Sequence, residues 1–356
     1  MINRDGAGLK TAGHSRMMRH ASPRSAGIPG PAVRFECPGL CDLQVNGFAG
    51  VDFNRPGCQP DELHAARDAL RASGVTRFLP TLITSSLERF AGCARVLAQW
   101  TDPAVAGIHM EGPYLSPTEA RGAHPAEHLR DATLDDFARR QDAAEGRIVL
   151  VTLAPEVPGA LRLIEHLAGR GIRVAIGHSD AAPAQVRDAV AAGATLSTHL
   201  GNGSRSSLPR HPNLVWEQLA ADALAASVIA DGHHLPPATL KSMVRAKTPS
   251  RVILVTDATA AAAAPPGRHT LGELEVESDS AGRVTLPGSE RLAGSALTLD
   301  RAVAVATAAT GLPLEEVLAM ASSRPAAFLG IPPSGRVTGD WDPRGGVLTV
   351  VRVEES

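Results

Sequence analysis

The chain has 356 residues, of which 44% are hydrophobic and 20% are charged, so it can bury a large core. Its net charge is −2 and only 3% of its residues are aromatic, which argues against a basic stripe or a stacking platform for nucleic acid. No apolar run approaches the ~20 residues needed to cross a bilayer. The basic N-terminus lacks the apolar centre of a signal peptide, so we expect a cytoplasmic protein. The cysteines show neither zinc-type pairing nor disulfide density and are expected to be inert thiols: Cys37, Cys41, Cys58 and Cys93.

Residues 1–37 are predicted to be an N-terminal extension. Their Gly, Ser and Pro content is typical of a loose chain, and the part from 25 to 38 can contribute strands to a small β appendage. Met17 or Met18 is a candidate for the true start of the protein.

Eight short runs rich in Val, Ile and Leu follow between residues 38 and 265. They are 40–45, 76–82, 105–110, 147–154, 173–178, 195–200, 226–231 and 251–257. Their apolarity is continuous rather than alternating, as expected of parallel strands that are buried on both faces. Alanine-rich segments with helical spacing lie between them, and several end on glycine. Eight alternations of strand and helix predict a (β/α)8 TIM-type barrel over residues 38–265.

The pattern changes after residue 265. Residues 266–291 carry turn signals and short alternating stretches, which predict an insertion that belongs to a small β-sandwich appendage. Residues 292–330 return to helical spacing and are predicted to close the barrel, with helices at 295–310 and 313–330. Residues 331–356 end in an alternating run, which predicts the C-terminal strand of the appendage. Because the N-terminal region does not contain a full pair of sandwich strands, the appendage is expected to be reduced.

Three residues of metal-ligand type lie at the ends of three predicted strands. Glu111 follows GIHM, His178 ends VAIGH, and His199 ends LSTH. The carboxyl ends of barrel strands gather at one face, where a carboxylate and two imidazoles suit a divalent metal such as zinc. In the alternative interpretation, Glu111 is an ion-paired core residue and the histidines are hydrogen-bonded within the barrel. The coincidence at three strand ends favours the metal site.

Two more polar positions are candidates for chemistry beside that site. Asp257 ends VILVTD and would carry the proton of a metal-activated water, although an aspartate there can also cap the next helix. His234 in ADGHHLP would hold a substrate carbonyl oxygen as charge develops. Its neighbour His233 competes for the same role.

At these residues the chain resembles the N-acetylglucosamine-6-phosphate deacetylases of the amidohydrolase superfamily. The similarity spans roughly residues 38–330 and includes PGLCDLQVNGFAGVDFN, HMEGPYLSPTEARGAHP, GATLSTHLGN and LAGSALTLDRAV. The resemblance implies hydrolysis of the acetamide of N-acetylglucosamine 6-phosphate to glucosamine 6-phosphate and acetate. It implies that Glu111, His178 and His199 bind the metal, that Asp257 is the acid/base, and that His234 polarises the carbonyl.

The resemblance also implies contacts with the sugar phosphate. These are expected from Ala123, His124, Asn202, Gly203, His234, Leu292, Ala293 and Gly294. Arg210 falls where the family places a phosphate-binding arginine, which in relatives reaches into the neighbouring subunit, so a homodimer is expected. Arg205 lies in the same loop and also favours an anionic sugar.

Gln44 and Asn46 stand where many amidohydrolases carry a His-x-His motif for a second metal. Amides are poor zinc ligands, so we expect one divalent ion per chain, zinc, with both amides hydrogen-bonded to the water or to neighbouring ligands. The segment HLGNGSRSSLPRHPN departs from the family pattern after His199. Two alternatives therefore stay open: an amidohydrolase acting on another N-acyl amino sugar or amide, and a catalytically silent binding barrel.

Overall fold

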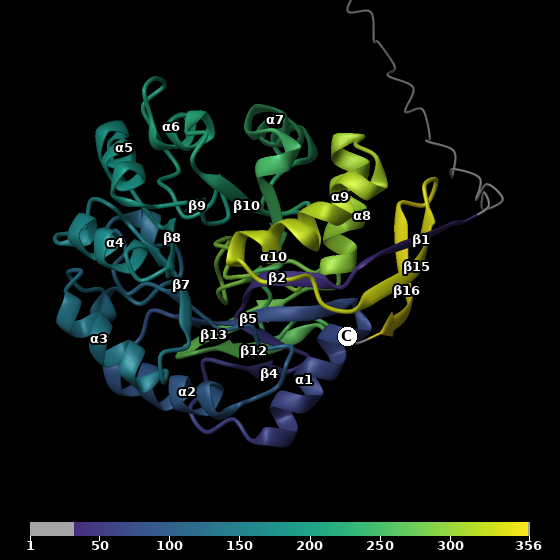
Figure 1. The fold of residues 1–356 in the computed structure, drawn as a ribbon, viewed down its shortest axis with the longest axis horizontal. Coiled ribbons are helices and arrows are strands. Elements are labelled where there is room, and N and C mark those ends of the chain that lie inside the picture. Colours follow the sequence, from purple (N-terminus) through teal and green to yellow (C-terminus); the bar gives the residue numbers. More distant parts are fainter. Residues whose placement is uncertain (1–31, 355–356) are drawn as a thin grey trace, which may run out of the picture.

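A barrel of eight parallel strands forms the centre of the structure, a computed structural model that describes residues 32–354 (Figure 1). The strands, in their hydrogen-bonded order, are β2 (Leu40–Val45), β5 (Val75–Ile83), β6 (Ile108–Glu111), β7 (Ile148–Leu153), β8 (Arg173–Ile176), β9 (Leu196–Ser197), β10 (Ala225–Ile229) and β11 (Val252–Val255). Spatial order follows chain order, which confirms the predicted TIM-type barrel. Most of the predicted N-terminal extension, with Met17 and Met18, lies outside the described residues.

The barrel closes between its first and last strands. Val45 at the end of β2 forms a parallel bridge with Ala258, just after β11, and the backbone N of Asn46 donates to Ala258 O at 2.7 Å. Every residue of β2, β6 and β11 is buried, because helices cover the outer face and side chains fill the interior. Closure therefore brings the polar residues at the carboxyl ends of the strands to one face.

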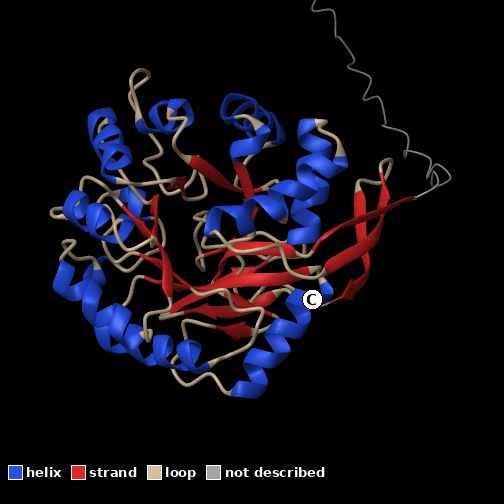
Figure 2. Cartoon of the chain, in the orientation of Figure 1, coloured by secondary structure: helices blue, strands red, loops and turns tan. Residues whose placement is uncertain are grey.

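A helix follows each barrel strand and covers the outside of the barrel (Figure 2). These helices are α1 (Pro60–Ala72), α2 (Leu87–Gln99), α3 (Leu134–Ala143), α4 (Ala160–Ala168), α5 (Pro183–Ala192), α6 (Leu214–Ala220), α7 (Pro237–Lys247) and α8 (Leu299–Thr310). The helix predicted over 313–330 is two helices, α9 (Leu314–Ala321) and α10 (Ser323–Leu329). The chain turns between them because the backbone at Ser322 leaves the helical region, with φ −131° and ψ −85°.

The two chain ends meet in an antiparallel sheet at one side of the barrel (Figure 1). β1 (Val33–Pro38) pairs with β15 (Arg336–Asp342), which pairs with β16 (Val347–Glu354). Burial alternates along β15, as expected of a sheet with one packed face. Within residues 32–354 the chain ends form this one three-stranded sheet, so the appendage is reduced, as expected, and is not a two-layered sandwich.

The insertion after β11 forms a sheet of its own. β12 (Gly267–Leu271), β13 (Leu274–Ser278) and β14 (Val284–Thr285) pair antiparallel and, in the described part of the chain, make no ladder with the chain-end sheet. Their inward residues form a small core with Ile83 and Ala293. The insertion therefore does not extend the appendage as expected, because its apolar face packs over the barrel instead.

A short hairpin, β3 (Gly47–Phe48) and β4 (Val51–Asp52), follows β2. The domain boundaries given above stay a prediction.

None of the helices within residues 32–354 is both long and apolar enough to span a membrane. The four cysteines are free and buried. Burial raises the pKa of Cys58 to about 11 and that of Cys37 to about 12, so both thiols stay protonated and unreactive at neutral pH.

Candidate active site

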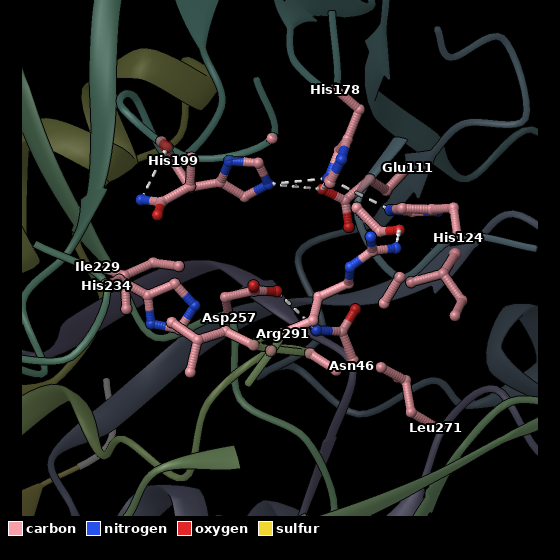
Figure 3. A pocket seen from close by; sticks show the side chains of 18 of the residues that line it. Asn46, Glu111, His124, His178, His199, Ile229, His234, Asp257, Leu271 and Arg291 are labelled. Atoms are coloured by element: carbon pink, nitrogen blue, oxygen red, sulfur yellow. Dashed lines mark hydrogen bonds and ion pairs between the residues drawn. The ribbon is translucent and has the colours of Figure 1, made fainter. Parts of the chain in front are cut away.

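A cavity of about 490 Å³ opens at the carboxyl ends of the barrel strands (Figure 3). It is lined by thirteen of the residues singled out from the sequence: Asn46, Glu111, Ala123, His124, His178, His199, Asn202, Gly203, His234, Asp257, Leu292, Ala293 and Gly294. The fold brings them together from segments spread over most of the barrel. Gln44 does not line the cavity but contacts two residues that do.

Glu111, His178 and His199 bring three donor atoms together. The Nε2 atoms of His199 and His178 lie 3.2 and 3.3 Å from Glu111 Oε1, and 3.1 Å from each other. Such separations match neighbouring ligands of one zinc ion with metal–ligand bonds of about 2.0–2.1 Å. The three side chains therefore fit one divalent ion.

The ring of His178 is oriented by a hydrogen bond on its other nitrogen. His178 Nδ1 lies 3.1 Å from Ala120 O, and a carbonyl oxygen can only accept, so Nδ1 carries the hydrogen. In this neutral tautomer the lone pair of Nε2 faces Glu111 and His199. A backbone carbonyl that orients a metal-binding imidazole in this way is common in metal sites.

His124 stands beside the same donor atoms, which sequence reasoning did not foresee. Its Nδ1 lies 2.9 Å from Thr84 Oγ1, whose own hydrogen is directed to Glu111 O at 3.4 Å, so Nδ1 donates and Nε2 keeps its lone pair. That Nε2 lies 3.2 Å from His178 Nε2. Burial lowers the pKa of His124 to about 3, so the ring is neutral at pH 7. Glu111, His124 and His178 each place a ligand atom within 4.8 Å of the others. We favour His199 over His124 as the third ligand because the distance from His199 to Glu111 is short, at 3.2 Å.

The backbone is strained where three of these side chains turn into the cavity. The φ angle is 49° at His178, 30° at His199 and 51° at Asp257, a region that costs non-glycine residues on the order of 1 kcal/mol or more each. Gly203 packs against both rings, since a Cβ there would lie 3.0 Å from His178 Nδ1 and from His199 Cε1. A side chain at position 203 would therefore push the rings out of place.

Asp257 faces the donor set, and the amide of Asn46 lies beside it (Figure 3). Asn46 Nδ2 donates to Asp257 Oδ1 at 2.7 Å. Gln44 Nε2 donates to the same oxygen at 3.1 Å and to Glu111 Oε1 at 2.9 Å, so it links the two carboxylates. Burial, reinforced by the charge of Glu111, raises the pKa of Asp257 to about 6. A carboxyl group that titrates near neutrality suits a group that accepts a proton and then returns it.

His234 and His233 point in different directions. His234 lines the cavity, and its Nδ1 lies 2.7 Å from Asp231 Oδ2. His233 Nε2 lies 3.1 Å from Ala281 O in the insertion, and His233 does not line the cavity. The geometry favours His234 for contact with a substrate, and it adds Asp231, which no sequence motif indicated.

Comparison with known proteins agrees with this geometry. The model of the amidohydrolase family matches residues 37–342. The chain belongs to the amidohydrolase family. Among its relatives, human N-acetylglucosamine-6-phosphate deacetylase is 40% identical over 318 residues, which cover 84% of this chain and 75% of the relative. N-acetylgalactosamine-6-phosphate deacetylase of Escherichia coli O157:H7 is 36% identical, over 83% of this chain and 78% of the relative.

A solved structure of a deacetylase is also similar to this amidohydrolase. The crystal structure of N-acetyl-D-glucosamine-6-phosphate deacetylase from Mycobacterium smegmatis matches with a TM-score of 0.83 at 32% identity, covering 94% of this chain and 89% of that one. The resemblance seen in the sequence is therefore confirmed. The chain is a hydrolase that acts on an amide bond.

Two charged residues of the amidohydrolase cavity were missed by the sequence analysis, Glu119 and Arg291. Glu119 opens a 3₁₀ turn, η1 (Glu119–Arg121), and its Oε1 accepts a hydrogen bond from the backbone of Ser206. Arg291 Nη1 donates to Gly122 O at 3.2 Å. The only signal in the sequence was that Arg291 directly precedes the LAGS segment.

Arg210 does not line the cavity of this chain. It is exposed, in the loop between His199 and α6, and the same loop carries Arg205, whose Nη1 lies 3.5 Å from Asp180 Oδ2. The expected contact between Arg210 and the substrate of a neighbouring subunit stays a prediction.

Proposed function

We propose that this amidohydrolase removes the acetyl group of N-acetylglucosamine 6-phosphate, yielding glucosamine 6-phosphate and acetate. The observation that carries the proposal is the set of donor atoms from Glu111, His178 and His199 facing Asp257 across one cavity. The human and Mycobacterium smegmatis relatives bear the name of this activity. The Escherichia coli relative bears the name of the galactosamine epimer, so the test must include both sugars.

The donor set is proposed to hold one divalent ion, zinc. A carboxylate with neutral imidazoles is a preferred zinc ligand set, whereas the amides of Gln44 and Asn46 are engaged with carboxylates. When bound, such an ion polarises a carbonyl group and lowers the pKa of water.

Asp257 is proposed to move the proton. Its Oδ1 accepts from Asn46 and Gln44, which leaves Oδ2 to face the cavity. The carboxylate takes a proton from water as the water oxygen bonds to the acetamide carbon. It then delivers that proton to the nitrogen as the C–N bond breaks. The products are acetic acid and the free amine, which ionise to acetate and an ammonium group at neutral pH.

His234 is proposed to hold the carbonyl oxygen during this step. Asp231 accepts the hydrogen on Nδ1, and we propose that the ring donates to the carbonyl oxygen through an N–H at Nε2. A donor aimed at the position where negative charge develops lowers the barrier, and its removal typically costs about 10²–10³ in kcat.

A homodimer is proposed to complete the phosphate end of the site through Arg210. A guanidinium matches phosphate with two parallel hydrogen bonds. The sugar contacts implied for Ala123, Asn202 and Leu292 are supported by their positions in the cavity lining. The free, buried thiols support a reducing, cytoplasmic location.

The test is acetate release by the zinc-loaded protein. The substrates are N-acetylglucosamine 6-phosphate, its galactosamine epimer and unphosphorylated N-acetylglucosamine, and we expect the highest kcat/KM with the first. Faster release from a different N-acyl compound would support the alternative amidohydrolase. A protein that binds zinc stoichiometrically but releases acetate from none of the compounds would support the silent barrel.

A further inference from the structure

Arg291 is the only arginine or lysine among the described residues that line the active-site cavity. It lies at the rim, is exposed, and extends over the cavity toward the loop that carries His124 (Figure 3). The carboxylates of the lining are Glu111 and Asp257, which are buried, and Glu119, which is exposed. Apart from its histidines, the cavity formed by the described residues therefore offers an anionic ligand one positive side chain, that of Arg291.

The backbone that carries Arg291 is held firmly. Its N donates to Ser289 Oγ at 3.0 Å, and its O accepts from the N of Leu286 at 3.1 Å. Two residues further on, Ala293 N donates to Val284 O at 3.2 Å, and Ala293 is buried in the small core of the insertion. The backbone at Arg291 is thus held by hydrogen bonds to the neighbouring residues of the insertion.

The guanidinium of Arg291 forms one hydrogen bond with the residues that the structure describes. One hydrogen bond, from Nη1 to Gly122 O at 3.2 Å, orients it, and it forms no ion pair with a carboxylate of residues 32–354. Arg283 stands in the same hairpin, residues 283–293, in which Thr285 and Leu292 form an antiparallel bridge. It differs from Arg291 because its Nη2 lies 2.7 Å from Glu290 Oε2, so its charge is paired. A guanidinium has five N–H groups in a planar fork that matches phosphate, so Arg291 can bind an anion without breaking an existing ion pair.

We propose that Arg291 binds the anionic end of the substrate within the same subunit and so sets the preference for a phosphorylated sugar. The inference rests on the proposed function for the identity of that anion, a sugar phosphate. It differs from the role proposed for Arg210, which requires a second subunit. The contact with Gly122 O places the guanidinium beside Ala123 and His124, on the side of the cavity where the sugar contacts are expected.

The test measures binding without turnover, by isothermal titration calorimetry of glucosamine 6-phosphate and glucosamine. Arg291→Gln removes the charge while keeping an amide that can donate to Gly122 O. Arg283→Gln is the matched control, since it removes a paired charge from the same hairpin. Charge-assisted hydrogen bonds of the usual strength predict that Arg291→Gln raises the Kd for glucosamine 6-phosphate about 10- to 100-fold. The Kd for glucosamine and both Kd values of Arg283→Gln should stay within about twofold of wild type.

Kinetics separate this inference from the proposed function. If the wild type binds glucosamine 6-phosphate through Arg291 but releases no acetate from any N-acetylhexosamine phosphate, the proposed function fails and the anion site stands. If the wild type is an active deacetylase and Arg291→Gln weakens both ligands equally, or neither, the inference is overturned and the function stands. Arg291→Lys should recover part of the lost affinity, because it restores the charge without the fork. A melting temperature close to wild type for each variant verifies that the hairpin still folds.

Discussion

His234 Nδ1 lies 2.7 Å from Asp231 Oδ2, and Asp231 Oδ1 accepts the backbone N–H groups of both His233 and His234 at 2.8 Å. One carboxylate therefore fixes the loop after β10 and the hydrogen on His234 Nδ1. Burial opposes the charge on Asp231, but the hydrogen bond from His234, the charge of that ring and the two backbone N–H groups together outweigh it and lower the pKa of this carboxyl. Asp231 is thus an anion that accepts the hydrogen of His234 Nδ1 and leaves Nε2 for contact with a substrate.

Asp231→Asn should lower kcat with little change in KM. The amide keeps an acceptor for the backbone but loses the negative charge beside His234 Nδ1. His234→Asn should lower kcat by about 10²–10³, the usual effect of losing an oxyanion donor. Steady-state kinetics on N-acetylglucosamine 6-phosphate measure both. His233→Ala is the control and should be near wild type, because that ring contacts Ala281 O outside the cavity. A larger loss of kcat in His233→Ala than in His234→Asn would show that His233, rather than His234, holds the carbonyl oxygen.

Asp257→Asn should keep the fold and the metal but lower kcat by ~10²–10⁴, the range for removing a general acid/base. The amide oxygen can still accept from Asn46 and Gln44 at the position of Oδ1, so the cavity should keep its shape. Kinetics, metal analysis and thermal unfolding of one preparation measure all three properties. Near wild-type turnover would show that another group carries the proton.

His178→Ala and His199→Ala should each lose the metal and the activity together. Both Nε2 atoms lie within 3.3 Å of Glu111 Oε1, so removing either ring takes one ligand away from the proposed metal site. Metal analysis after dialysis against a chelator and zinc reloading should find about one ion per wild-type chain. His233→Ala, which removes a histidine outside the cavity, is the control for nonspecific loss of metal. Two tightly bound ions per chain, with one lost in Gln44→Ala, would refute the single-metal site.

Asp42 should make stability depend on pH. Burial raises its pKa from 3.8 to about 7, although hydrogen bonds from Thr256 act in the opposite direction. Because the folded state holds this proton more tightly than the unfolded state, the contribution of Asp42 to stability is largest below about pH 4 and declines as the pH rises to about 7. Asp42→Asn should remove that decline.

Urea unfolding of wild type and Asp42→Asn at several pH values between 4 and 7 measures this effect. The difference in unfolding free energy should shift in favour of the variant as the pH rises. Asp61→Asn, at an exposed position in the first turn of α1, is the control for a carboxyl group that is not buried. If the unfolding free energies of wild type and Asp42→Asn change in parallel with pH, Asp42 does not titrate in this range.

Arg210→Ala should raise KM for N-acetylglucosamine 6-phosphate about 10- to 100-fold and leave the unphosphorylated sugar unchanged, as expected for losing a charge-assisted contact. If the contact crosses a dimer, mixing Arg210→Ala with Asp257→Asn subunits should restore some activity, because one hybrid site then has both residues intact. Each variant alone at the same total concentration is the control. An equal change of KM for both substrates, with no activity restored in the mixture, would show that Arg210 does not bind the phosphate.

The sequence by itself determined the barrel and the positions of its strand ends. Runs such as 252–255 are apolar at every residue, and that local property is sufficient to indicate a strand buried on both faces. Since parallel strands in one barrel present their carboxyl ends on one face, Glu111, His178, His199 and Asp257 could be expected to meet before any distance was known. The family resemblance added the contacts of the surrounding loops.

Only the tertiary structure decided the relationships between residues that no local pattern links. The insertion could be predicted as β structure, but its packing over the barrel mouth depends on which apolar faces meet after closure, and that packing places Arg291 at the cavity. The approach of His124 to His178 and the tautomers of both rings depend on hydrogen bonds between distant segments. Such contacts form through space after the chain has closed many loops, so their partners cannot be read from the spacing of residues along it.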